Sequence, residues 1–164
     1  MLRDKNLIPL SHQHQHALAL CVRIDRASPI ADADLPAWQA EIAQQFEHEI
    51  RIHFAAEEEI VFPAASKFAE LTSLVGQLIS EHADLRAKFK SALDKNLSSG
   101  DLKTFANRLA DHIRKEERVL FERLQQLMSA EEMIILGQKL DHALAKAGQA
   151  CAMPNETTRL RSAK

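Results

Sequence analysis

The chain has 164 residues and a mass of 18.4 kDa, which fits one domain large enough to bury a core without disulfide or metal staples. Its formal net charge of -2 provides no broad basic face, so nucleic acid is excluded as an expected partner. The two cysteines, Cys21 and Cys151, form no CxxC motif and fit a reducing cytoplasm. No signal peptide and no apolar run of roughly 20 residues is present, so we expect a cytoplasmic protein with no membrane partner.

The composition favours helices, because the chain has only four glycines, five prolines and no tyrosine. Helix-breaking and capping residues divide it into five predicted helices, which span about residues 11–27, 36–63, 67–96, 101–128 and 129–148. Ser11 and Asp101 are the expected N-caps of the first and fourth, and Ser129 with Glu132 forms a capping box for the fifth.

Four consecutive helices with short connections predict antiparallel neighbours. The expected fold is therefore all-α, an up-down-up-down four-helix bundle with a short fifth C-terminal helix. Residues 1–150 are expected to form this single domain, and residues 151–164 a flexible C-terminal tail.

The second and fourth predicted helices carry polar residues on their inward, apolar faces. His53 is followed four residues later by Glu57, and His112 by Glu116. This spacing places an imidazole and a carboxylate on the same face one helical turn apart, where both reach the same small volume. A buried carboxylate is costly unless it is neutralised, paired or bound to metal, so these pairs indicate a metal site.

The first and third predicted helices each add an inward histidine, His82 and, on the best helical phase, His14. His12 and His16 remain alternatives to His14 if that phase differs. At about 1.5 Å per residue the four histidines fall in one layer of the bundle. Mixed imidazole and carboxylate ligands suit iron or manganese.

The remaining polar residues near these motifs are interpreted as surface groups. They are His48, His142, Glu58, Glu59 and Glu117. A charged residue in a helix is most often on its solvated face.

Across about residues 7–128 the sequence resembles the hemerythrin-like domain. The motifs LSHQHQHAL, HFAAEEEIVFP, EHADL and HIRKEERVLF occur in the order typical of that family. The resemblance implies a di-iron site bridged by carboxylate or oxo groups, with Glu57 and Glu116 as bridging ligands. It also implies terminal histidine ligands, namely His14, His53, His82 and His112. Manganese or zinc are substitutes for iron at such a site.

Two departures from oxygen-carrying hemerythrins set this chain apart. Leu78 and Arg86 occupy the positions where a fifth histidine is expected. Oxygen-carrying hemerythrins also usually have an aspartate five residues after the last histidine, whereas here Glu116 follows His112 by four residues. The set of four histidines and two glutamates is similar to di-iron proteins associated with iron–sulfur cluster repair and nitrosative stress. Those proteins also carry glutamates matching Glu49 and Glu81, which are expected to support the ligands or to serve as alternative ligands.

The resemblance implies a non-haem di-iron protein that binds or senses O2 or NO, with a redox protein as a further partner. Two alternatives stay open: a di-iron oxidoreductase or iron donor in cluster repair, and a helical interaction module with a structural metal. The sequence identifies neither the physiological ligand nor the oligomeric state.

Overall fold

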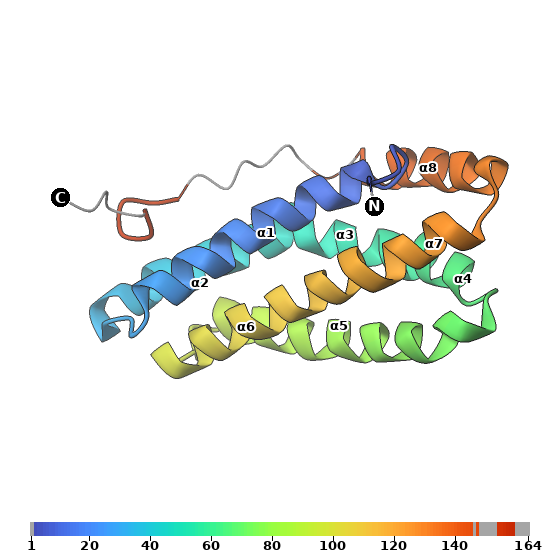
Figure 1. Cartoon of the computed structure of the whole chain (residues 1–164). Helices are drawn as coiled ribbons and strands as arrows, with labels where there is room; N and C mark the ends of the chain where they lie inside the picture. Colours follow the sequence, from blue (N-terminus) through green and yellow to red (C-terminus); the bar gives the residue numbers. More distant parts are fainter. Residues whose placement is uncertain (1, 146, 148–153, 160–164) are drawn as a thin grey trace.

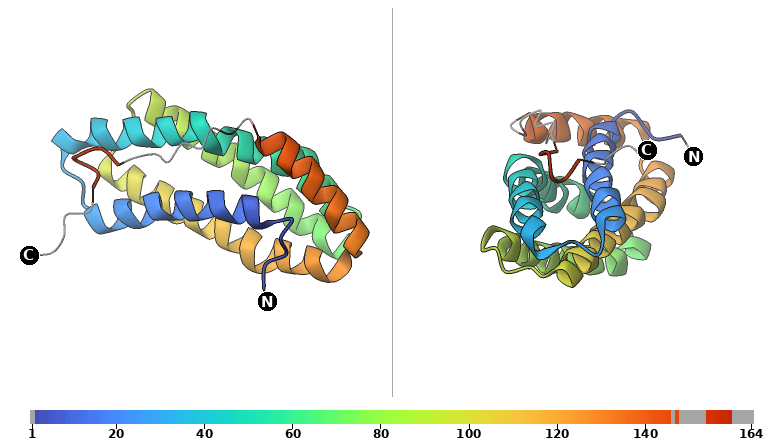
Figure 2. Two further views of the ribbon diagram at one scale, coloured as in Figure 1. Left: turned by 90° about the horizontal axis from the view of Figure 1, so that it is seen from above. Right: turned by 90° about the vertical axis from the view of Figure 1, so that its left-hand side faces the viewer.

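The computed structural model describes residues 2–145, 147 and 154–159, and within these residues it contains helices and no strand. Four long helical segments run antiparallel to their sequence neighbours and form a bundle, and a fifth helix packs across one end (Figure 1). The view along the bundle shows the four segments around a common centre (Figure 2). The predicted all-α fold, a four-helix bundle with a short fifth helix, is confirmed.

The helical segments succeed one another in chain order. The first is α1 (Ile8–Ala27), after which a 3₁₀ turn, η1 (Asp32–Asp34), leads into the second. The second combines α2 (Leu35–Gln45), η2 (Phe46–Ile50), α3 (Arg51–Ala56), η3 (Glu57–Val61) and α4 (Phe62–Ala65). After the 3₁₀ turn η4 (Ala69–Leu71), the third is α5 (Thr72–Leu93). The fourth combines α6 (Ser99–Lys115), η5 (Glu116–Leu120) and α7 (Phe121–Leu127), and the fifth is α8 (Ala130–Leu144).

Several predicted helix boundaries differ from the structure. α1 begins at Ile8, so Ser11 lies inside the helix and is not its cap, because a proline such as Pro9 is tolerated in a first helical turn. The N-cap of α6 is Ser98, whose hydroxyl accepts from the Asp101 backbone while the Asp101 carboxylate accepts in return. The capping box predicted for Ser129 is present. α5 begins later than expected, after the separate turn η4, and the predicted end of the last helix near residue 148 lies outside the described residues.

Three short π-helical stretches interrupt the second and fourth segments. Two of them, η3 and η5, begin at Glu57 and Glu116, which occupy matching positions in the two His-x-x-x-Glu motifs. A π turn inserts one residue into the helix and rotates the residues after it, and such turns often occur at functional sites. The two motifs are therefore alike in backbone conformation as well as in sequence.

The apolar core is divided into two clusters along the bundle. One is centred on side chains such as Ile24, Trp38 and Phe105, and the other on side chains such as Leu10, Phe62 and Phe121. Each bundle segment passes from one cluster to the other through a polar residue. In α5, for example, His82 lies between Leu78 of one cluster and Leu85 of the other. The polar residues thus form a layer with a dry, packed core on either side.

None of the described helices is long and apolar enough to cross a membrane. Of the tail predicted to be flexible, residues 154–159 are described, and the rest of it lies outside the described residues together with the predicted domain boundary at 150. In the described part, Thr158 is buried and its backbone carbonyl accepts from Arg23 of α1, while Asn155 donates to the carbonyl of Ala37 in α2. This piece of the tail is held against the bundle.

Replacing each of two helical glycines by alanine should change the stability of the protein in opposite directions. Gly76 of α5 has no atom within 4 Å of an added Cβ, so Gly76→Ala should raise the free energy of unfolding by about 1 kcal/mol through helix propensity alone. At Gly137 of α8 the added carbon would lie 2.3 Å from Oδ1 and 2.7 Å from Cβ of Asn6. Gly137→Ala should therefore lower stability, because the N-terminal segment must shift. Thermal unfolding of both variants measures the difference, and equal stabilisation by both would contradict this packing.

Candidate metal centre

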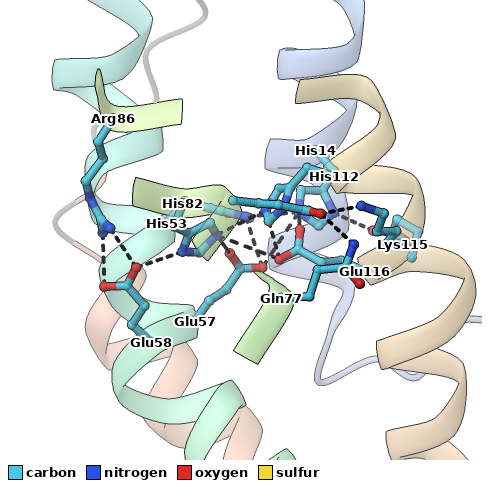
Figure 3. Close-up of polar contacts among 12 residues, drawn as sticks. His14, His53, Glu57, Glu58, Gln77, His82, Arg86, His112, Lys115 and Glu116 are labelled. Atoms are coloured by element: carbon cyan, nitrogen blue, oxygen red, sulfur yellow. Dashed lines mark hydrogen bonds and ion pairs between the residues drawn. The ribbon is translucent and has the colours of Figure 1, made fainter. Parts of the chain in front are cut away.

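Six buried side chains from the four bundle segments converge in the polar layer (Figure 3). Two segments supply one histidine each, and the other two supply a histidine and a glutamate. None of the six residues is more than 4% exposed. They are His14, His53, Glu57, His82, His112 and Glu116. All six candidate ligands named from the sequence are therefore brought together.

The six residues form two groups that share both carboxylates. In the first group, which we call the His14/His53 half-site, two imidazoles meet Glu57 and Glu116. In the second, the His82/His112 half-site, two other imidazoles meet the same carboxylates. Within each group the potential ligand atoms lie within 4.8 Å of one another, close enough to hold a metal ion. Two cations bound in this way would be bridged by both glutamates.

The inward nitrogens lie unusually close in pairs. The Nε2 atoms of His14 and His53 are 2.9 Å apart, and those of His82 and His112 are 3.0 Å apart. Within each His-x-x-x-Glu motif the histidine also lies close to its glutamate. Nε2 of His53 is 3.2 Å from Glu57 Oε1, and Nε2 of His112 is 3.1 Å from Glu116 Oε1. Converging nitrogen and oxygen lone pairs of this kind are the donor set that iron and manganese accept.

The two carboxylates require positive charge. All four oxygens of Glu57 and Glu116 are buried and have no hydrogen-bond partner among the described residues, which would be costly for free carboxylates. Burial raises the pKa of Glu57, but His53 and His82 outweigh it and hold the pKa below its ordinary value. Burial lowers the pKa of His14 and His112, but the glutamates outweigh it and raise these pKa values to about 9 and about 10. The layer therefore holds its negative charge either against protonated imidazoles or against metal ions that displace those protons, and the donor set fits the latter.

Each of the four imidazoles is held from outside by one hydrogen bond at Nδ1. Glutamate or glutamine oxygens only accept, so each Nδ1 donates and each Nε2 is left facing the centre. The donor–acceptor distances are 2.7 to 2.9 Å, and the acceptors are Glu117 for His14, Gln13 for His53, Glu58 for His82 and Glu81 for His112. This outer ring fixes the orientation of every candidate ligand.

Two of these acceptors were misassigned from the sequence. Glu58 and Glu117 were expected on solvated faces, but each is the residue after a central glutamate and is turned by the π turn toward a histidine of another helix. The duplicated Glu-Glu pairs in the two motifs were the signal that could have identified them. Glu59 is exposed as expected.

Arginines secure both of these glutamates in the same manner. Arg86 donates to both oxygens of Glu58 and lies 5.3 Å over the ring of Phe54, which stacks on His82. Arg3, from the N-terminal segment, donates to Glu117 and lies over the ring of Phe121, which stacks on His14. Arg86, which stands where a fifth histidine was considered, thus supports a candidate ligand from outside.

The other residues named from the sequence lie around this centre. His14 is the inward histidine of α1, whereas His12 and His16 are exposed, as are His48 and His142. Glu81 accepts a hydrogen bond from Nδ1 of His112 and also binds Lys115, and its bond to His112 contributes most to lowering its pKa to about 2.

Glu49 is buried beside a small cavity, and its carboxylate accepts from Nδ1 of His16 at 3.1 Å. It belongs to neither group that could hold a cation. The cavity is lined by His14, His53 and Glu49 among others, and about 10 Å³ of it is open to the centre of a water molecule. This is room for one water-sized group, and the cavity is lined by both imidazoles of the His14/His53 half-site and by His112 of the other half-site.

The bundle and its two histidine–glutamate groups define a helical cation-binding protein. The hemerythrin HHE cation-binding domain matches this chain over residues 9–124. The chain therefore belongs to the hemerythrin HHE cation-binding domain family, which confirms the resemblance noted in the sequence. No curated protein and no solved structure matches it.

Neighbouring glutamates provide a matched test of the outer ring. Glu58→Gln replaces the charged acceptor of His82 Nδ1 by an amide, so metal affinity should fall by roughly 10–100-fold. Glu59 is the next residue and is exposed, so Glu59→Gln removes the same charge without touching a histidine. It should leave the metal affinity within about twofold of the unmodified protein. Metal competition with a chelator measures both variants, and an equal loss in the two would show that only net charge matters.

Proposed function

We propose that this protein holds two non-haem irons between its four bundle segments and uses them to bind or sense O2 or NO. The proposed ligands are the six converging residues, with Glu57 and Glu116 bridging the two irons and two histidines completing each half-site. Iron in such a site supplies one-electron redox changes and open coordination positions for a diatomic molecule.

The observation that carries this proposal is the pair of buried carboxylates shared by two histidine pairs. Four buried carboxylate oxygens without a hydrogen-bond partner among the described residues are what a pair of cations would satisfy. The donors are oxygen and nitrogen with no thiolate among them, which favours iron or manganese.

The cavity beside the His14/His53 half-site supports a small ligand. It has room for one water-sized group, which favours a diatomic ligand over a larger organic substrate. Binding or sensing of a small molecule is thus favoured over turnover of a larger one.

Iron analysis tests the metal assignment. The purified protein, loaded anaerobically with Fe²⁺, should contain two irons per chain, and His53→Ala or His112→Ala should lower that number because each removes one ligand from one half-site. His48→Ala, at an exposed histidine, is the matched control and should leave it unchanged. Well below two irons per chain, unaffected by either site substitution, would exclude this function.

Optical spectra of the oxidised and reduced iron protein test the ligand assignment. Adding azide to the oxidised form, or NO to the reduced form, should change the absorption of the iron, because each half-site offers two histidines and leaves coordination positions open. A spectrum insensitive to both, in a protein that unfolds when its iron is chelated, would instead indicate a structural metal in an interaction module. Sustained consumption of NO or peroxide would indicate a di-iron oxidoreductase. Transfer of iron to an apo iron–sulfur protein would indicate an iron donor in cluster repair.

A further inference from the structure

The outer ring of the centre is nearly symmetric. His53 and His112 lie at matching positions of the two motifs, as do Glu58 and Glu117, which hold the histidines of α5 and α1. The remaining two acceptors each precede a histidine: Gln13 comes before His14 and Glu81 before His82. Gln13 accepts a hydrogen bond from Nδ1 of His53, and Glu81 accepts one from Nδ1 of His112.

The symmetry is broken at this last pair. His112 donates to the carboxylate of Glu81, whereas His53 donates to the amide oxygen of Gln13. The exchange is matched on the neighbouring helix: Lys115, three residues after His112, binds Glu81, and the corresponding residue three after His53 is the buried Ala56. The charged residues Glu81 and Lys115 on one side thus correspond to the uncharged residues Gln13 and Ala56 on the other.

The difference between Glu81 and Gln13 changes how strongly His112 and His53 donate an electron pair to a cation. A carboxylate acceptor at Nδ1 raises the basicity of the imidazole, and a hydrogen bond to a charged acceptor is about twice as strong as one to a neutral amide. Both imidazoles of the His82/His112 half-site have carboxylate acceptors, Glu58 and Glu81. In the His14/His53 half-site only His14 has one.

We propose that Gln13 and Glu81 make the two metal positions unequal, so that the His82/His112 half-site holds its metal ion more tightly and loses it last. The inference rests on the two-metal function proposed above. Gln13 and Glu81 are positioning residues here, because each acts on the metal through an imidazole. Both imidazoles of the weaker position line the cavity, whereas of the tighter half-site only His112 does.

The surroundings of the two half-sites agree with this order. His82 stacks on Phe54 with ring centroids 3.8 Å apart and lies 5.3 Å from Phe62, so this side is closely packed. His14 stacks more loosely on Phe121, at 5.7 Å, and borders the cavity. Of the half-site with two charged acceptors only His112 borders the cavity, whereas both histidines of the other half-site do, so the former has less room to rearrange.

Stepwise removal of iron from the loaded protein tests the order. Protein carrying two Fe²⁺ per chain is exposed anaerobically to rising concentrations of a ferrous chelator, and crystals taken at one iron per chain are measured at the iron absorption edge. We expect two steps that differ at least tenfold in affinity, with the retained iron in the His82/His112 half-site. Retention in the His14/His53 half-site, or equal occupancy of both, would overturn the proposal.

Three variants separate the residues proposed from general charge effects. Glu81→Gln should weaken the tighter step by roughly 10–100-fold and bring the two steps together, and Gln13→Glu should strengthen the weaker step by about tenfold. Asp84 is an exposed residue of α5, one helical turn after Glu81. Asp84→Asn removes a negative charge there and should change neither step. An effect of Asp84→Asn as large as that of Glu81→Gln would contradict a role through His112.

These outcomes stay distinct from the test of the proposed function. A loaded protein with well below two irons per chain contradicts the di-iron function itself. Two irons per chain that leave in the wrong order, or in an order that Glu81→Gln does not alter, contradict only the assignment to Gln13 and Glu81.

Discussion

The structure depends on two carboxylates, Glu57 and Glu116, buried in the middle of an apolar bundle. Neither is hydrogen-bonded within the described residues, so each must be balanced by positive charge. Four imidazoles from all four segments surround them, and these imidazoles can carry either protons or metal ions. The two apolar clusters above and below the layer lower the polarity around it and make this requirement strong. Folding of the bundle and occupation of the centre are therefore linked.

The outer ring converts this charge requirement into a defined geometry. An isolated imidazole can rotate and exchange the roles of its two nitrogens, but a carboxylate or amide oxygen at Nδ1 fixes both. Arg86 and Arg3 in turn fix two of these carboxylates while packing on the aromatic rings beside the histidines. Since Arg3 belongs to the N-terminal segment, part of the support for His14 comes from outside the four bundle segments.

Much of the fold and the centre could be predicted from sequence because both depend on helical periodicity. Inward phase favoured His14 while leaving His12 and His16 open, and the four-residue spacing paired His53 with Glu57. The roles of Glu58 and Glu117 could not be predicted in this way, because the π turns that begin at Glu57 and Glu116 change the phase of the residues after them. The bond from His53 to Gln13 was also beyond reach, because it joins two helices whose relative rotation no periodicity specifies.

In the centre that we propose, a nearly repeated sequence would provide two unequal metal positions. The repeat supplies the shared parts: a histidine, a central glutamate that belongs to both half-sites, and a second glutamate that contacts a histidine of another helix. The difference comes from helices α1 and α5, which are not repeats of each other and carry Gln13 and Glu81 before their histidines. Because these residues lie outside the two motifs, their exchange alters one imidazole while leaving the bridging carboxylates in place. An unequal pair would also suit the proposed uptake of a small molecule, since one position would hold its metal firmly while the other, whose two histidines both line the cavity, would stay open to change.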